Sequence, residues 1–406
     1  MRLLIVSSQY PPGWSPESAH TLLLCEQLAA RGIEVDLLTS ELLPGFPEPK
    51  GFRLHPWMKS WGWRQLPSLL FSIRRLRPEA VLLIYIDWIY DCHPMITFAP
   101  AILRWLHPRT PLVTQFENVS GLSGIIPPNG TKSRLVKRLV SLLAGRRGLH
   151  PTYGSLLRDS SHIIALSERH AEAFAIAHPG VSSKTRVIPA PPAMRFAGEE
   201  KAGSARQRGR MLLGLSEQDV VLAYFGYIYW AKGMETLLTA FGSLQPDTRL
   251  VIIGGSADIG YLEKLHELSR SAGCAERVIW AGYCKPEEEF ASLYLHAADI
   301  CVLPFNDGVT LNNSSFAVAA SHGLPIVTTR GKSLEAPFVD GENVRLCPPN
   351  NAVALAATIA EVIHSPETRK RLSAGARKLA ENCFSWDRVI ESTLEVLNAP
   401  FTGQSK

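Results

Sequence analysis

The chain has 406 residues, of which 46% are hydrophobic and 19% are charged, with 29 Pro and 30 Gly. This composition excludes disordered, fibrous and low-complexity proteins, and the length predicts two to three domains, since one domain usually holds about 100 to 200 residues. The net charge of +5 is small for this length, so binding of a polyanion would need a local basic patch.

The seven cysteines contain no C-x-x-C pair. An odd number without such spacing fits neither a disulfide framework nor a zinc site, and it favours a reducing, cytoplasmic compartment. The apolar run at residues 3–6 is too short for the core of a signal peptide. Since charges or prolines interrupt every longer apolar stretch before about 18 residues, we expect no transmembrane helix.

Short runs of Val, Ile and Leu alternate along the chain with amphipathic stretches of helical length, which indicates βαβ units and parallel sheets. The expected strands of the first half are 2–7, 33–39, 80–86, 111–115, 162–166 and 185–189. A second series of strands follows at 219–225, 249–253, 277–281, 299–303 and 325–328, with helices at 233–244, 259–272, 286–296, 313–322, 351–363 and 367–381. The sequence therefore predicts an α/β protein with two doubly wound, Rossmann-like domains.

A polar stretch without apolar periodicity begins at Gly198 and predicts the boundary between the domains. We expect an N-terminal domain at 1–198, a linker at 199–215, a second domain at 216–384, and a terminal helix and tail at 385–406. In open α/β sheets, ligands bind outside the carboxyl ends of the strands, so two such domains would face a cleft lined by strand-to-helix loops.

The first such loop, 7–18, contains Pro12, Gly13 and Trp14 and precedes a helix that ends before Gly32. The start of a helix can offer unpaired N–H groups to an anion. An ordinary loop with only a structural role would have the same sequence pattern. The loop lacks the G-x-G-x-x-G pattern, which argues against a dinucleotide cofactor, and we expect no cofactor.

Two loops of the second half carry more polar chemistry. After a strand ending at Gly226, Lys232 directly precedes Gly233 and a helix start, where an ammonium and a helix N-terminus could together hold a diphosphate. The other loop, 303–315, holds a run of Asn, Thr and Ser that could donate hydrogen bonds to phosphate or sugar. The alternatives are a solvated surface lysine and simple helix capping.

The order of these segments resembles the family 4 retaining glycosyltransferases of the GT-B fold over nearly the whole chain. The similarity rests on the Pro-Pro loop, the segment Leu28–Val35, and, in the second half, on 225–233, 251–255, 280–282, 298–304 and 322–327. The segment from Phe384 resembles the terminal helix that crosses back onto the first domain in this family. The resemblance implies transfer of a sugar from a nucleotide-sugar with retention of configuration.

On this basis we expect the following residues to form the site. Donor-binding residues are Gly226, Tyr227, Gly233, Gly254, Tyr283, Asp307, Gly308, Val309, Thr310, Leu311, Asn312, Asn313, Ser314 and Arg330; catalytic residues are Glu117 and Lys232; the acceptor-side loop holds Pro12, Gly13 and Trp14.

The chain departs from the family at several of these positions. Thr310 and Val318 stand where the family often has the two carboxylates of an E-x7-E pair, and Tyr227 stands where an Arg usually accompanies the lysine. The tyrosine removes one positive charge from the expected diphosphate site, and Arg330 could replace it. These changes leave open a catalytically weakened protein that binds a glycan or a partner, and a sugar-nucleotide epimerase is a second alternative.

Glu117 follows the strand at 111–115, where the family often has a His that faces the donor sugar. A carboxylate there could accept a proton from an acceptor hydroxyl or stabilise a cationic transition state, unless it is merely a solvated loop residue. No D-x-D motif occurs, which agrees with catalysis by Lys and helix ends without a metal.

Between Asn118 and Arg158 the sequence contains no Asp or Glu but several basic residues interleaved with apolar ones at near-helical spacing. The basic residues are Lys132, Arg134, Lys137, Arg138, Arg146, Arg147 and Arg158. The pattern is typical of a packed helix with a solvated basic side, or of a helix that docks on an anionic membrane and serves a lipid-linked acceptor. Nucleic acid binding is disfavoured, because no aromatic platform accompanies the charges.

Overall fold

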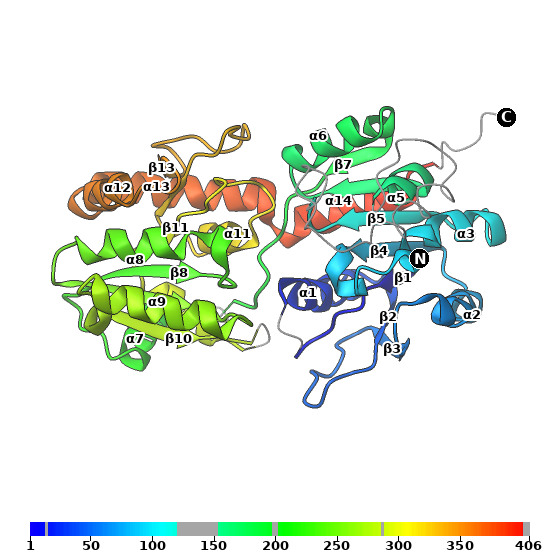
Figure 1. Ribbon diagram of the computed structural model, residues 1–406, viewed down its shortest axis with the longest axis horizontal. Helices are drawn as coiled ribbons and strands as arrows, with labels where there is room; N and C mark the ends of the chain where they lie inside the picture. The colour runs from blue at the N-terminus through cyan, green and yellow to red at the C-terminus, as the bar shows by residue number, and fades with distance from the viewer. Residues whose placement is uncertain (13–14, 120–152, 197–201, 286–287, 401–406) are drawn as a thin grey trace. The chain divides into compact units, whose positions relative to one another are not determined.

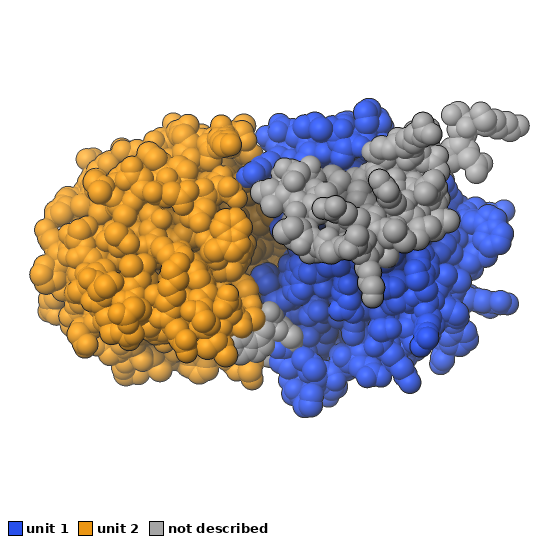
Figure 2. All heavy atoms as spheres, in the orientation of Figure 1, with its two compact units in different colours: residues 1–189, 389–406 blue, residues 190–388 orange. Residues whose placement is uncertain are grey.

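The computed structural model describes residues 1–12, 15–119, 153–196, 202–285 and 288–400 and separates the chain into two compact units (Figures 1 and 2). Unit 1 comprises residues 1–189 and 389–406, and unit 2 comprises residues 190–388. Each unit is built on its own parallel sheet.

Unit 1 has a seven-stranded sheet in the order β3-β2-β1-β4-β5-β6-β7, with every neighbouring pair parallel. The strands are β1 (Arg2–Val6), β2 (Glu34–Ser40), β3 (Arg53–Met58), β4 (Ala80–Tyr85), β5 (Leu112–Phe116), β6 (His162–Ala165) and β7 (Thr185–Val187). The helices are α1 (Pro16–Ala30), α2 (Leu66–Leu76), α3 (Ala99–Leu106), α5 (Gly154–Asp159), α6 (Glu168–Ala177) and, for most of its length, α14 (Trp386–Asn398).

Unit 2 has a six-stranded parallel sheet in the order β10-β9-β8-β11-β12-β13. The strands are β8 (Val220–Phe225), β9 (Thr248–Ile253), β10 (Val278–Gly282), β11 (Ile300–Leu303), β12 (Ile326–Thr329) and β13 (Arg345–Cys347). The helices are α7 (Ala202–Leu212), α8 (Met234–Gly242), α9 (Ile259–Ser271), α10 (Phe290–Ala297), α11 (Ser314–Ser321), α12 (Ala352–His364) and α13 (Pro366–Leu379).

In unit 2, α8 packs against α9 and α12, while α7 packs against α10 and α11 against α13; α13 also contacts α12, the helix that precedes it. This arrangement is expected because right-handed crossovers that leave the central strand in opposite directions place their helices on opposite faces of the sheet. The two predicted doubly wound, Rossmann-like domains are thereby confirmed.

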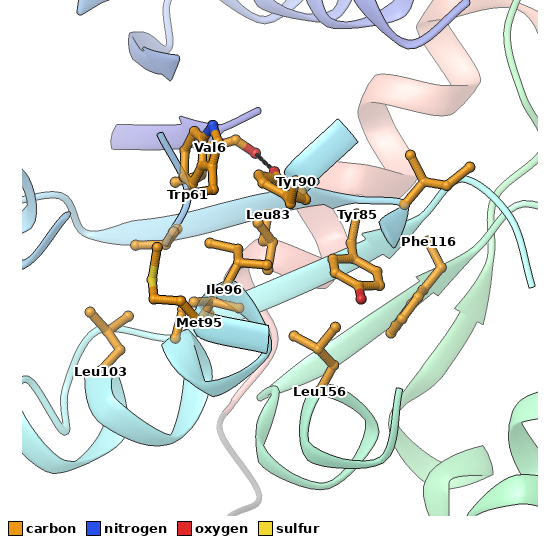
Figure 3. Close-up of a cluster of buried hydrophobic side chains, with 14 of the residues drawn as sticks. Val6, Trp61, Leu83, Tyr85, Tyr90, Met95, Ile96, Leu103, Phe116 and Leu156 are labelled. Carbon is orange, nitrogen blue, oxygen red and sulfur yellow. Dashed lines mark hydrogen bonds between the residues drawn. The ribbon is translucent and has the colours of Figure 1, made fainter. Parts of the chain in front are cut away.

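The core of unit 1 explains why its strands read as continuous apolar runs. All six residues of β4 are buried, as a strand covered on both faces requires. Figure 3 shows Tyr85, Tyr90 and Phe116 in this core. The Tyr90 hydroxyl lies 2.7 Å from the carbonyl of Ile84 and 3.2 Å from that of Val6, so its polar end is satisfied inside the apolar cluster.

Every predicted strand is present, but the structure adds the edge strands β3 and β13. The β3 segment contains His55, Pro56 and half-buried side chains, so it lacks an apolar run, and Pro is tolerated there because the strand lies at the sheet edge. β13 has only three residues. Edge strands are buried on fewer sides, and their sequences are correspondingly less regular.

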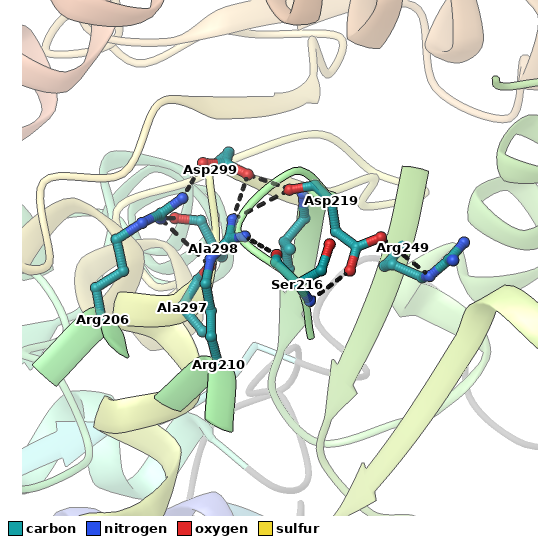
Figure 4. A network of polar contacts seen from close by, with 9 residues as sticks. Arg206, Arg210, Ser216, Asp219, Arg249, Ala297, Ala298 and Asp299 are labelled. Carbon is teal, nitrogen blue, oxygen red and sulfur yellow. Dashed lines mark hydrogen bonds and ion pairs between the residues drawn. The ribbon is translucent and has the colours of Figure 1, made fainter. Parts of the chain in front are cut away.

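The segment 199–215, predicted as a linker, contains helix α7, which spans residues 202–212 and belongs to unit 2. The helix is held by charge as well as by apolar contact, which is why no apolar period revealed it. Arg206 donates to Asp299 at 2.7 Å, and the fully buried Arg210 reaches the other carboxylate oxygen of Asp299 at 3.1 Å (Figure 4). The unit boundary lies at 189/190 instead.

The chain returns to unit 1 after unit 2, as the resemblance implied. Residues from Val389 onward belong to unit 1, and Glu395 of α14 lies 3.6 Å from Arg186 in the same unit. Both partners are well exposed, so this ion pair contributes little and the buried apolar face of α14, including Val389, Ile390 and Leu397, fixes the helix.

Candidate functional site

The candidate site in unit 2 lies at the point where the strand order reverses. Strands β8 and β11 are neighbours in the sheet. After β8 the chain continues through β9 to β10 at one edge, and after β11 it continues through β12 to β13 at the other edge. In doubly wound sheets, ligands bind at such a point, beside the loops that follow the carboxyl ends of the two strands. The two loops are 226–233 and 304–313, which are the two that the sequence singled out.

Glycines allow these loops to approach one another closely. A Cβ atom on Gly254 would lie 2.0 Å from the carbonyl oxygen of Gly226, and one on Gly233 would lie 1.8 Å from that of Pro304. Gly233 also has φ +70°, which side chains disfavour. The loop after β8 is therefore in close contact with the loops after β9 and β11, with Gly226 against Gly254 and Gly233 against Pro304.

Lys232 ends a short turn at Trp230–Lys232, immediately before Gly233 caps helix α8. Its ammonium lies 4.9 Å from the centre of the Phe305 ring and 5.5 Å from that of Tyr229. The faces of both rings attract a cation, and together they hold the ammonium against the loop after β11. The lysine is therefore built into the contact between the two loops.

The loop after β11 divides into apolar and polar positions. The side chains of Val309 and Leu311 are buried, and their N–H groups already donate to Thr329 O and to the Glu335 carboxylate. These two residues shape the loop and present no free donor. The Asn313 side-chain oxygen accepts from Thr310 N at 2.8 Å, which fixes the turn before α11.

At the start of α11 the hydroxyl of Ser315 is buried and has no hydrogen-bond partner among the described residues. It lies beside Gly226, whose Cβ would sit 3.7 Å from the hydroxyl oxygen. The buried side-chain oxygen of Asn306 is likewise unpartnered and faces Gly233. Orphaned buried groups are rare, and these two occur where the glycine-lined loops meet. Both residues lie in the predicted loop 303–315, although neither was among the individual donor-binding residues expected from the sequence.

The structure places the other expected donor residues along the same edge. Gly308 lies against the backbone of Gly331, which brings Asp307 and Gly308 next to Arg330. Tyr283 is half-buried and follows β10. Asn312 and Ser314 complete the loop at the start of α11, where the Ser314 N–H donates to the Asn312 carbonyl.

Tyr227 is held by the backbone of the neighbouring loop. Its hydroxyl accepts from Ala257 N at 2.9 Å, while its own carbonyl accepts from the Tyr224 hydroxyl at 3.2 Å. The residue therefore serves as a spacer between the loops after β8 and β9. It supplies no cation where the family usually has an Arg.

Val318 is fully buried in α11, so this helix offers no side chain to a ribose from that position. A buried carboxylate that sequence reasoning missed contacts the loop after β11, where Glu335 accepts from Leu311 N at 2.6 Å. No spacing pattern pointed to it, because it acts through a residue 24 positions earlier.

In unit 1 the residue of interest is Glu117, at the end of β5. Its side chain is 11% exposed and accepts a hydrogen bond from Gln115 Nε2 at 2.7 Å. The same amide lies 2.9 Å from His20 Nε2, so its two hydrogens can serve both neighbours. Glu117 is thus part of a buried polar cluster with α1 and is not a solvated loop residue.

Burial decides the protonation of this cluster. It raises the pKa of Glu117 to about 7, against the lowering effect of the Gln115 hydrogen bond, and it lowers the pKa of His20 to about 4. The two groups lie 3.9 Å apart, yet near pH 6 both are largely neutral, so they do not form an ion pair. A carboxyl that titrates near neutrality can both donate and accept a proton.

The first loop is only partly described. Pro12 is half-buried, whereas Gly13 and Trp14 lie outside the described residues. Helix α1 is capped from within, because the Ser15 side chain accepts from Ser18 N at 3.1 Å and Glu17 is buried in the first turn. An acidic residue already occupies the positive end of this helix, which argues against the predicted anion site.

Residues 132–147, the predicted basic segment, lie outside the described residues. Arg158 is described and pairs with the buried Asp159 at 2.6 Å, so its charge is used within unit 1. Within the described ranges, none of the helices has the length and apolar character that crossing a bilayer would require.

Comparison with known proteins identifies the class that this fold and site define. The family model described as Glycosyl transferases group 1 matches residues 208–379, and the one described as Glycosyl transferase 4-like domain matches residues 18–191. The chain belongs to this glycosyltransferase family, and the resemblance inferred from the motifs is confirmed.

Among curated proteins, D-inositol 3-phosphate glycosyltransferase of Corynebacterium diphtheriae is 30% identical over 46% of this chain and 44% of its own length. The chain thus aligns with about half the length of these first relatives. Glycogen synthase of Mycobacterium tuberculosis is 24% identical over 100% of this chain and 96% of its own length.

Solved structures confirm the GT-B fold. Sucrose-phosphate synthase from Thermosynechococcus elongatus has a TM-score of 0.73 at 18% identity, covering 98% of both chains. HepE of Anabaena, solved in complex with UDP and glucose, has a TM-score of 0.70 at 18% identity and covers 98% of this chain and 99% of its own.

Proposed function

We propose that this protein transfers a sugar from a nucleotide-sugar donor to a hydroxyl group of an acceptor. The observation that carries the proposal is the meeting of the loops after β8, β9 and β11, with Lys232 held between two of them and the unpartnered Ser315 hydroxyl beside Gly226. The complex of HepE with UDP and glucose supports a nucleotide-sugar as the donor, since the two folds match over 98% of this chain.

Lys232 is the group that we assign to the leaving diphosphate. Departure of a nucleoside diphosphate develops negative charge, and a positioned cation stabilises that charge most when it needs no reorganisation. The rings of Phe305 and Tyr229 hold the ammonium in place in advance. We extend the proposal to catalysis without a metal ion, with Lys232 and the start of α11 supplying the positive charge.

We assign Glu117 to the reacting sugar or the acceptor hydroxyl. Its pKa of about 7 makes the carboxylate available at neutral pH as a proton acceptor or as a partner for a cationic transition state. Gln115 fixes the orientation of the carboxyl through the hydrogen bond at 2.7 Å. Retention of the anomeric configuration belongs to the proposal as well, on the strength of the family.

For the acceptor we propose a lipid-linked saccharide or the precursor of a cell-surface polysaccharide. Support comes from the sequence of the basic segment, in which cations alternate with apolar residues and no carboxylate offsets them. Such a segment would bring the protein to the inner face of a membrane as a peripheral protein.

A second candidate, binding of a glycan or partner without turnover, is favoured by one observation. The buried Val318 and the engaged Tyr227 hydroxyl leave this edge with fewer charged groups than the family usually has. The two candidates differ in whether the protein turns over its donor.

The experiment is a transfer and donor-hydrolysis assay with a panel of nucleotide-sugars. In Lys232→Ala we expect kcat to fall about 100-fold or more, the cost typical of a lost transition-state donor, with the unfolding temperature unchanged. Lys378→Ala, an exposed lysine of α13, is the matched control and should keep full activity. Equal activity of both variants would refute the role of Lys232, and saturable donor binding without turnover in the unaltered protein would favour the second candidate.

A further inference from the structure

Unit 2 contains a hollow at the opposite edge of its sheet from the candidate donor site. Its volume is about 340 Å³, within the usual range of small-molecule sites. Ala298 and Asp299 in its wall directly precede β11, and Leu324 and Pro325 directly precede β12. The hollow therefore lies at the amino ends of these strands, whereas the donor-side loops follow their carboxyl ends.

The lining of this hollow is strongly basic. It holds the side chains of Arg206, Arg369, Lys370 and Arg377, against the single carboxylate of Asp299. That carboxylate is already shared, since it accepts from Arg206 at 2.7 Å and from the buried Arg210 at 3.1 Å (Figure 4). Among the described residues of the wall, no other carboxylate balances the remaining positive charge.

A simpler explanation accounts for half of these cations. Helix C-termini carry partial negative charge and attract basic side chains. Arg206 donates to the carbonyls of Ala297 and Ala298 at the end of α10, and Arg369 donates to those of Val362 and Ile363 at the end of α12. These two guanidinium groups have a structural role.

Arg377 lies in the last turn of α13, but among the described residues neither it nor Lys370 donates to a helix carbonyl. Within the part of the chain that the structure describes, neither cation has a hydrogen-bond acceptor or a carboxylate within ion-pair distance. They lie seven residues apart on α13 and both line the hollow, together with the half-buried Ser373.

The turn that follows α11, at Gly323, leaves room for the Arg377 side chain. Its Nε atom lies where a Cβ on Gly323 would be only 1.9 Å away, so the absence of a side chain at Gly323 makes room for the guanidinium. The imidazole of His296 beside it has a pKa lowered by burial first and by the Arg377 charge second. Burial lowers the pKa of His322 to about 4, so at neutral pH the permanent cations set the charge of the hollow.

From this arrangement we infer that the hollow binds a small organic phosphate monoester, with Lys370 and Arg377 as its charged ligands. A phosphate dianion matches two cations, and a guanidinium can donate two parallel hydrogen bonds to it. The volume leaves room for an attached group of the size of a glycerol or a sugar. This inference does not rest on the proposed transferase activity.

The site is linked to the donor side by one short helix. α11 begins at Ser314 beside the candidate donor loop and ends at Ser321, directly before His322 and Gly323 in the wall of the hollow. A ligand at the hollow would therefore contact the far end of the helix whose start carries Ser315.

The test is calorimetric titration of the full-length protein with glycerol 3-phosphate, at a fixed ionic strength near ~0.15 M so that general screening stays constant. We expect saturable binding that weakens about tenfold or more in the double variant Lys370→Ala/Arg377→Ala, as loss of charge-assisted hydrogen bonds implies. Lys370→Ala alone removes an exposed side chain without partners, so it keeps the test valid if the double variant is unstable. The same α13 helix supplies the control, Lys378→Ala, which should bind as the unaltered protein does.

Two further arms separate the sources of the phosphate and the two sites. Vesicles containing phosphatidic acid carry the same monoester on a lipid, so binding of vesicles and not of glycerol 3-phosphate, lost in the double variant, assigns the site to a lipid headgroup. Lys232→Ala should leave the titration unchanged. Absence of saturable binding to either probe, an equal loss in Lys378→Ala, or a loss only in Lys232→Ala would overturn the inference.

Discussion

Replacement of Glu117 by Gln tests whether burial really holds this carboxyl neutral. The change keeps the shape of the side chain, and Gln115 Nε2 can still donate to the oxygen that it now contacts at 2.7 Å. Because the pKa of Glu117 rises from 4.5 to about 7 on folding, the folded protein binds this proton more tightly than the unfolded chain does. Stability contributed by the neutral carboxyl is therefore lost as the pH rises from 4.5 to 7.

The size of this loss follows from the two pKa values. At about 1.36 kcal/mol for each unit of pKa, it amounts to about 3 kcal/mol. His20 acts in the opposite sense, because its pKa falls from 6.5 to about 4 on folding, and stability is lost as the pH falls through this range. Between pH 4.5 and 6.5 the two slopes nearly cancel in the unaltered protein.

Glu117→Gln removes only the slope that belongs to the carboxyl. The free energy of unfolding of the variant, relative to that of the unaltered protein, should therefore rise by about 3 kcal/mol between pH 4.5 and 7. Urea denaturation, monitored by hydrogen exchange in peptides that contain β5, measures this difference for unit 1. Glu172→Gln on the exposed face of α6 is the control. Its free energy of unfolding, relative to that of the unaltered protein, should not change with pH. A level difference for Glu117→Gln as well would show that the carboxylate is solvated and ionised, and it would remove the basis for its catalytic assignment.

Two other changes test the loops and the basic segment. Gly233→Ala should destabilise unit 2 by more than ~2 kcal/mol and impair donor turnover, because its Cβ would lie 1.8 Å from Pro304 O. The control is Gly214→Ala, at φ +64° with nothing within 4 Å of its Cβ, which should cost only about 1 kcal/mol. Calorimetry measures both losses of stability, and similar values would contradict the close approach of Gly233 to Pro304. The free energy of binding to anionic liposomes, measured by co-sedimentation, should become weaker by about 1 kcal/mol for each basic residue neutralised. Unchanged binding would refute membrane docking. The residues to neutralise are Lys137, Arg138, Arg146 and Arg147.

The order and type of the central elements could be predicted from the sequence, since a strand buried on both faces must be apolar throughout. β4 is the clearest case, with six buried residues in a run of Ala, Val, Leu, Ile and Tyr. The positions of the loops were equally accessible, because glycine and polar residues mark the junction of a strand and a helix. Gly226, Lys232 and Gly233 were found in this way.

Tertiary structure alone decided which side chains meet and what state they are in. Nothing local in the sequence joins His20 to Gln115 and Glu117, because the contact depends on α1 packing beside β5 across 95 residues of chain. The helix at 202–212 was hidden for the same reason: the partner of Arg206 and Arg210 is Asp299, about 90 residues away. Apolar patterning records burial residue by residue, whereas the pairing of charges and the pKa of a carboxyl depend on neighbours that only the folded chain brings together.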